Sequence, residues 1–148
     1  MMSLSQTTGH AVRALACLAG CTTPPASIKD VSHCAGVPQP YLAKIVKRLN
    51  EAGIVASKRG SKGGIWLARP ARLISLYEVA EAVEGSDFLG SCLYGFDACS
   101  DARDCPVHGF WVKTRDSIRR ELVRTKLSDV LDFYLKQGRL QMEEHQSG

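Results

Sequence analysis

Three cysteines and one histidine lie within a short segment rich in glycine and aspartate, CLYGFDACSDARDCPVH. They are Cys92, Cys99, Cys105 and His108. Thiolate sulfur and imidazole nitrogen are favoured ligands of iron–sulfur clusters and zinc. The cysteines are separated by six and five residues, wider than the usual zinc ligand pairs. The segment therefore predicts a metal site, with an iron–sulfur cluster favoured over zinc.

Upstream of this segment, the sequence predicts two short helices joined by a tight turn. The first covers residues 27–35, where Ser27 and Asp30 form a variant capping box. Gly36 ends it, and the turn Val37–Pro38 follows. The second helix begins near Pro40 and ends at Gly53. Its predicted core stripe consists of Leu42, Ile45, Val46 and Leu49. Such a pair predicts a helix-turn-helix.

Two short apolar runs, residues 54–56 and 65–67, follow and predict two strands. The glycine-rich stretch SKRGSKGG lies between them and suits a flexible hairpin, because glycine adopts the required turn conformations. This hairpin is typical of a wing beside a DNA-reading helix. Its basic residues are Lys58, Arg59 and Lys62.

Basic residues are concentrated on this helix and wing. Residues 41–62 carry a net charge of +5, whereas the whole 148-residue chain carries +4. Such concentration favours contact with DNA phosphates over a merely solvated face. Gln39 and Lys44 are long donors near the helix start and are predicted to contact base edges. Arg59 is predicted to enter the minor groove. The predicted phosphate contacts are Tyr41, Lys47 and Arg48, with Lys58 and Lys62 on the wing.

The remaining elements are predicted to be helical. One helix covers residues 7–19, and Ser75 with Glu78 forms a capping box at the start of another. A long helix begins at Pro106 and is followed by a short one over residues 128–136. Apolar residues spaced as in a partner-helix seam are Val107, Trp111, Ile118 and Leu122, with Thr114 between them.

The predicted fold class is mostly α with a small β-wing. We expect a winged helix-turn-helix domain over residues 1–85, a cysteine-bearing loop over 86–105, and a dimerisation helix with a C-terminal helix over 106–140.

Arg13 interrupts the apolar run AVRALACLAGC, and the uninterrupted part is too short for a signal peptide. A cytoplasmic location is therefore expected, where six cysteines favour metal or redox chemistry over structural disulfides. Cys17 and Cys34 are expected to be core residues.

The order of these parts resembles the IscR/NsrR-type family of bacterial iron–sulfur winged-helix regulators over about residues 3–135. The resemblance is carried by LSQTTGHAVRALACLA, VPQPYLAKIVKRLNEAGIV, RGSKGGIWLARP, ISLYEVAEAVEG, the spaced cysteines, CPVHGFW and TKLSDVL. It implies a homodimer, joined through the long helix, that binds imperfect palindromic operators in double-stranded DNA. It also implies His108 as the histidine ligand. Some relatives have an acidic ligand where this chain has Gly9.

Together these features predict a DNA-binding transcription regulator, a repressor, whose DNA affinity depends on an iron–sulfur cluster. A two-iron cluster is preferred over a four-iron cluster. The signal could be redox state, nitric oxide, oxygen or iron status. The alternative is a cluster-free regulator that uses the cysteines as thiol switches or as a zinc site. No enzyme activity, small-molecule substrate or membrane partner is expected, because the chain offers no nucleophile–base arrangement.

Overall fold

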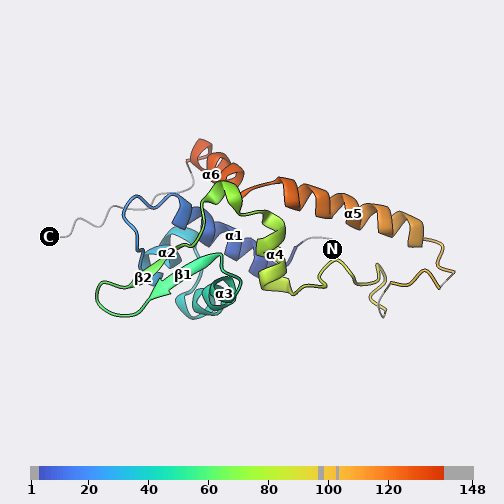
Figure 1. Ribbon diagram of the computed structural model, residues 1–148, viewed down its shortest axis with the longest axis horizontal. Coiled ribbons are helices and arrows are strands. Elements are labelled where there is room, and N and C mark those ends of the chain that lie inside the picture. The colour runs from blue at the N-terminus through green and yellow to red at the C-terminus, as the bar shows by residue number, and fades with distance from the viewer. Residues whose placement is uncertain (1–3, 97–98, 103, 139–148) are drawn as a thin grey trace.

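The computed structural model describes residues 4–96, 99–102 and 104–138, and Figure 1 shows how its elements are arranged. Two strands form one antiparallel hairpin, and the rest of the regular structure is helical. The elements are α1 (Gln6–Ala19), α2 (Ile28–Ala35), α3 (Gln39–Glu51), β1 (Val55–Lys58), β2 (Gly64–Leu67), a 3₁₀ turn (Ala71–Leu73), α4 (Leu76–Glu84), α5 (His108–Arg124) and α6 (Leu127–Lys136). The predicted fold class is thereby confirmed.

Helices α1, α2, α3 and α4 with the β-hairpin form a head around one apolar core. The predicted stripe of α3 is confirmed, because Leu42, Ile45, Val46 and Leu49 are all buried. Helix α2 is only eight residues long and buries Val31 and Ala35. Because the apolar residues of α3 point inward, its lysines remain on the outer face.

Side-chain caps determine where several of these helices begin. The Ser27 hydroxyl accepts a hydrogen bond from the Asp30 backbone N–H (3.0 Å) and donates one to the Asp30 carboxylate (2.7 Å). At α4 the predicted capping box is complete: Ser75 accepts from the Glu78 N–H, and Glu78 accepts from the Ser75 N–H. These caps satisfy backbone donors that the first helical turn leaves without partners.

The wing is the hairpin of β1 and β2, paired from Val55–Leu67 to Lys58–Gly64. Its tip requires glycine: a Cβ at residue 63 would lie 2.0 Å from the Lys58 carbonyl oxygen. Gly64 has φ +151°, and a Cβ there would lie 2.5 Å from the Ala26 carbonyl oxygen. The glycine-rich tip therefore brings the two strands together tightly while its basic side chains stay exposed.

Helix α5 extends away from the head, whereas α6 returns to pack on α1 (Figure 1). Leu127 at the start of α6 is fully buried, and its backbone N–H bonds to the Ile74 carbonyl (2.8 Å). In contrast, α5 contains no buried residue in the described part of the chain. It begins at His108, two residues later than predicted, so Val107 lies at its N-cap rather than within its apolar seam.

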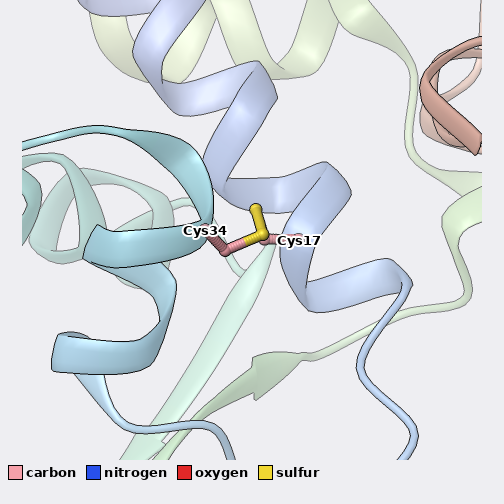
Figure 2. The surroundings of a disulfide bond; sticks show 2 residues. All are labelled: Cys17 and Cys34. Atoms are coloured by element: carbon pink, nitrogen blue, oxygen red, sulfur yellow. A yellow bond between two sulfur atoms is a disulfide. The ribbon is translucent and has the colours of Figure 1, made fainter. Parts of the chain in front are cut away.

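The structure corrects one expectation about the cysteines. Cys17 and Cys34 are joined by a disulfide bond that links α1 to α2 (Figure 2), whereas we expected the six cysteines to avoid structural disulfides. Cys17 does lie in the core, fully buried, and Cys34 is half-buried against it. The two cysteines are 17 residues apart on different helices, and sequence spacing does not reveal such a pairing.

Some expectations concern residues outside the described part. The expected C-terminal segment extends to residue 140, and residues 139 and 140 are among those not described, as are residues 1–3 of the expected DNA-binding domain. Among the helices that the structure does describe, none has both the length and the apolar character needed to span a membrane.

Candidate nucleic-acid interface and metal-binding hollow

The eight residues predicted to contact DNA are all exposed, and they lie on α3 and the wing. Helix α3 carries Gln39, Tyr41, Lys44, Lys47 and Arg48. The wing carries Lys58, Arg59 and Lys62. Exposed basic groups on a helix and a neighbouring hairpin can approach the phosphates on both sides of one groove. The local structure thus fits the predicted interface without testing its individual contacts.

Tyr41 and Arg48 also connect α3 to its neighbours. The Tyr41 hydroxyl is 2.5 Å from the Thr7 hydroxyl of α1, and its ring lies edge-on to His10 with centroids 5.5 Å apart. Arg48 donates a hydrogen bond to the Val83 carbonyl near the end of α4 (2.8 Å). Both side chains therefore help to seat the predicted recognition helix, in addition to any contact they make with DNA.

The end of α4 is joined to α1 through Glu84. Its carboxylate accepts hydrogen bonds from the Ser5 N–H (3.0 Å) and the Thr8 hydroxyl (2.6 Å). Although burial alone would raise the pKa of Glu84, these hydrogen bonds and the positive charge of Arg48 lower the pKa below its ordinary value. The carboxylate is therefore held charged at the junction of α1, α3 and α4.

The four predicted metal ligands line one hollow of about 290 Å³ at the start of α5. Cys92, Cys99 and Cys105 come from the preceding loop, and His108 is the first residue of α5. Tyr94, Phe96, Ser100 and Asp104 complete the lining. All three cysteines are free thiols and half-buried. The fold therefore brings the predicted ligands to one place, although they span 17 residues of sequence.

His108 has a polar partner on each ring nitrogen. Nδ1 lies 3.1 Å from the Cys99 sulfur, and Nε2 lies 2.5 Å from a carboxylate oxygen of Asp101. A histidine that binds a metal commonly donates its other N–H to a carboxylate, which fixes the ring orientation and makes the ligating nitrogen more basic. If Nε2 carries the proton and donates it toward Asp101, the lone pair of Nδ1 is available for a metal held by the neighbouring sulfurs.

The loop is held by three further contacts. The Trp111 indole N–H of α5 donates to the Ser91 carbonyl (2.8 Å), immediately before Cys92. The Gly95 N–H bonds to the Cys92 carbonyl (3.0 Å), and the His108 N–H bonds to the Cys105 carbonyl (3.1 Å). Trp111 was predicted only as a seam residue, so its position beside the cysteine loop is a structural finding.

The donor set, three thiols and one imidazole, fits an iron–sulfur cluster in its chemistry. Although the four side chains line one hollow, among the residues described no three Cys, His, Asp or Glu side chains are gathered tightly enough to hold a metal ion. His10 of α1 contacts Tyr41 and accepts a hydrogen bond from Arg13. Burial and the nearby positive charge of Arg13 lower the pKa of His10 below its ordinary value.

Asp101, the carboxylate partner of His108, could not be recognised from the sequence. Several aspartates lie within a few residues of the cysteines, so sequence alone offers no reason to choose Asp101. Only the contact of Asp101 with His108 in the folded chain distinguishes this carboxylate from the others.

Comparison with known proteins gives a consistent result. A family model named Rrf2 and described as an iron-dependent transcriptional regulator matches residues 4–132. An HTH-type transcriptional regulator of Aquifex aeolicus is 28% identical over 134 residues, covering 89% of this chain and 93% of that protein. The transcriptional regulator IscR of Cronobacter sakazakii is 31% identical, covering 73% of this chain and 66% of that protein.

Two solved structures have a similar fold. The IscR structure from T. potens has a TM-score of 0.73 at 27% identity, and covers 97% of this chain and 93% of that one. CymR of B. subtilis, titled the global cysteine regulator, has a TM-score of 0.75 at 22% identity, and covers 90% of this chain and 98% of that one. The first likeness extends the sequence match, whereas the second concerns the fold alone.

Proposed function

Because this chain belongs to the Rrf2 family of transcriptional regulators, we propose that it is a homodimeric, cytoplasmic repressor whose affinity for an imperfect palindromic operator depends on an iron–sulfur cluster. The observation that carries the proposal is the coexistence of two features in one chain. An exposed basic helix and wing form one, and a hollow lined by Cys92, Cys99, Cys105 and His108 forms the other. No enzymatic step is involved, since the relatives are named as regulators.

Cys92, Cys99 and Cys105 would hold the cluster through their thiolates, and His108 through Nδ1. A bound cluster would supply a centre that reacts with oxidants or nitric oxide. The His108 ring is oriented by Asp101, so its ligating nitrogen faces the Cys99 sulfur. The Trp111 indole keeps the start of the loop against α5. We propose a two-iron cluster with mixed sulfur and nitrogen ligation by these residues. A four-iron cluster is the alternative.

A chain of contacts leads from the loop to the predicted recognition helix. The loop follows α4 directly, and the last turn of α4 bonds to Arg48 of α3 and to Ser5 and Thr8 at the start of α1. A change in the loop can therefore alter how α3 is seated. Such a change regulates DNA binding only if the two cluster states differ in their affinity for DNA.

The proposed dimer is supported by the surface of α5. Phe110 and Val123 are 61% and 46% exposed. Trp111, Ile118 and Leu122 line a hollow of about 310 Å³ together with Leu4, Ser5, Glu84, Phe88 and Leu89. A long helix that buries none of its described residues in its own chain is well suited to pack against a second copy.

The test begins with anaerobic purification. We expect a coloured protein with visible absorbance. This protein is then used to select a DNA duplex from a random-sequence pool. The affinity of this selected duplex is then measured by fluorescence anisotropy before and after cluster removal. Cys99→Ser should abolish the absorbance and the dependence of affinity on the cluster. Cys21→Ser, which changes a half-buried cysteine of the head outside the hollow, is the matched control and should retain both.

A colourless protein that binds DNA equally well before and after chelation would contradict the proposal. The second candidate, a cluster-free regulator with a zinc or thiol site, is favoured by the close approach of Cys99 to His108. It predicts bound zinc by elemental analysis, or thiol-dependent DNA binding, in place of the visible absorbance.

A further inference from the structure

The disulfide bond between Cys17 and Cys34 lies in the DNA-binding head, away from the cysteine loop. Figure 2 shows the bond crossing from α1 to α2. In Figure 1 the loop between α4 and α5 extends beyond α4, toward the end of the long axis opposite α2. The protein therefore contains two separate groups of cysteines, and the proposed cluster accounts for only one of them.

The bond holds an element that has little stability of its own. Helix α2 has eight residues, of which two are buried, and helices of this length are marginal without tertiary support. Cys34 is near its C-terminus, and the fully buried Cys17 anchors the bond in the core. Because the bond joins the last turn of α2 to α1, breaking it removes a covalent constraint on the turn that follows.

That turn leads directly into the predicted recognition helix. The Ser32 hydroxyl of α2 donates to the Val37 carbonyl (2.5 Å), and the Val37 N–H bonds to the Ser32 carbonyl (3.1 Å). Helix α3 begins two residues later, at Gln39. A shift of α2 relative to α1 is thus transmitted to the first turn of α3, where Gln39 and Tyr41 lie.

We propose that Cys17 and Cys34 form a reversible dithiol–disulfide site, oxidised by low-molecular-weight disulfides, whose disulfide state strengthens DNA binding. In a reducing compartment, a disulfide is usually transient and redox-responsive rather than structural. The proposed function places this chain in the cytoplasm, which is such a compartment, and the readout on DNA rests on the same proposal. Whether the two cysteines pair can be tested without it.

The exchange proceeds through the more accessible sulfur. Cys34 is half-buried, whereas Cys17 has no exposed surface. The Cys34 thiolate attacks one sulfur of the small disulfide, and one thiolate leaves with the electron pair of the broken bond. The Cys17 thiolate then attacks the Cys34 sulfur and expels the second thiolate. The two cysteines lose two electrons and two protons, and one small disulfide becomes two thiols.

The test uses the full-length protein in anaerobic mixtures of reduced and oxidised glutathione. Exchange is stopped with acid, the protein is unfolded in denaturant so that the buried Cys17 can also react, and free thiols are alkylated. The labelled peptides are identified by mass spectrometry. We expect Cys17 and Cys34 to lose reactivity together as the mixture becomes more oxidising, while Cys21 stays reactive. Persistence of both as free thiols throughout, or pairing of either with another cysteine, would overturn the proposed site.

The same samples are then titrated with the duplex selected by the wild-type protein. We expect affinity in wild type and in Cys21→Ser to fall about fivefold or more on reduction. Cys34→Ser should show weak binding that does not respond to glutathione, and cluster absorbance is matched across all samples. Cys34→Ala is the second variant if serine at this half-buried position prevents folding.

Equal redox responses of wild type and the Cys34 variants would overturn the regulatory role. Failure to select any duplex would contradict DNA binding, and with it the proposed function, whereas the thiol map would still decide whether this pair forms. The two failures are therefore distinguishable.

Discussion

At the scale of single residues, His108 joins a thiol and a carboxylate. Its Nδ1 faces Cys99 and its Nε2 faces Asp101. If Nδ1 binds iron, Asp101→Asn should leave a cluster in place but shift its spectrum and reduction potential, because the carboxylate no longer makes the ring more basic. His108→Ala should have the same effect more strongly. Absorbance and electrochemical titration provide the measurement, and Asp104→Asn, which changes a carboxylate lining the hollow, is the control. An unchanged potential in both His108 and Asp101 variants would exclude His108 as a ligand.

A second prediction at this scale concerns Glu84 and the dependence of folding stability on pH. Its pKa is lowered below the ordinary 4.5 by hydrogen bonds from Ser5 and Thr8 and by the charge of Arg48, which together outweigh burial. A carboxyl group whose pKa is lowered on folding adds stability above its unfolded pKa and loses it as pH falls through the folded pKa.

We therefore expect wild type to lose more stability than Glu84→Gln as pH falls from about 5 toward about 3. Denaturant unfolding at each pH measures this difference. Because the residue is exposed, the difference should be below about 1 kcal/mol. Glu81→Gln, on the same helix, is the control and should follow wild type.

At the scale of elements, α3 presents two lysines for which we predict different roles. Lys44 lies nearer the helix start and is predicted to read a base, whereas Lys47 is predicted to contact phosphate. Lys44→Ala should cost about 1–3 kcal/mol against the preferred sequence and relax specificity at one position. Lys47→Ala should weaken all duplexes alike and reduce the salt slope by about 1. Competition binding with single-base variants of the selected duplex separates the two outcomes. Equal losses on specific and random DNA for Lys44→Ala would contradict its role in base reading.

Helix α5 makes a prediction about assembly. Ile118 lies in the apolar seam and is half-buried beside α4. Ile118→Asp should place an unpaired carboxylate in the proposed dimer contact, at a cost of several kcal/mol. Analytical ultracentrifugation should then show monomers, and operator affinity should fall. Ser117→Asp adds the same charge at the neighbouring exposed position and should remain dimeric. Retention of the dimer in Ile118→Asp would show that the seam packs only within its own subunit.

At the scale of the whole molecule, charge placement predicts strongly salt-dependent DNA binding. The chain carries only +4, yet residues 41–62 carry +5, so the side proposed to face DNA is basic and the remainder is nearly neutral. A dimer that contacts several phosphates per subunit should lose about a thousandfold in affinity between about 50 and about 200 mM salt. Anisotropy titrations at several salt concentrations measure the slope. A nearly flat response would contradict the phosphate contacts proposed for the helix and wing.

The local features of this protein could be read from its sequence because they depend on residues close together in the chain. The apolar stripe of α3, the capping box of Ser75 and Glu78 and the glycine tip of the wing are confirmed. Each is governed by helical periodicity, a cap three residues away or a required backbone angle. Cys92, Cys99, Cys105 and His108 were predicted from their spacing to be metal ligands; they line one hollow, and their binding of a metal stays a prediction.

Only the tertiary structure determined the contacts between elements that are distant in the sequence. The bond between Cys17 and Cys34 depends on how α1 crosses α2. The anchoring of Arg48 on Val83 depends on how α3 meets α4. The choice of Asp101 among several aspartates depends on its contact with His108 in the folded chain. No local pattern encodes these pairings, since they arise only when the common core brings separate helices together.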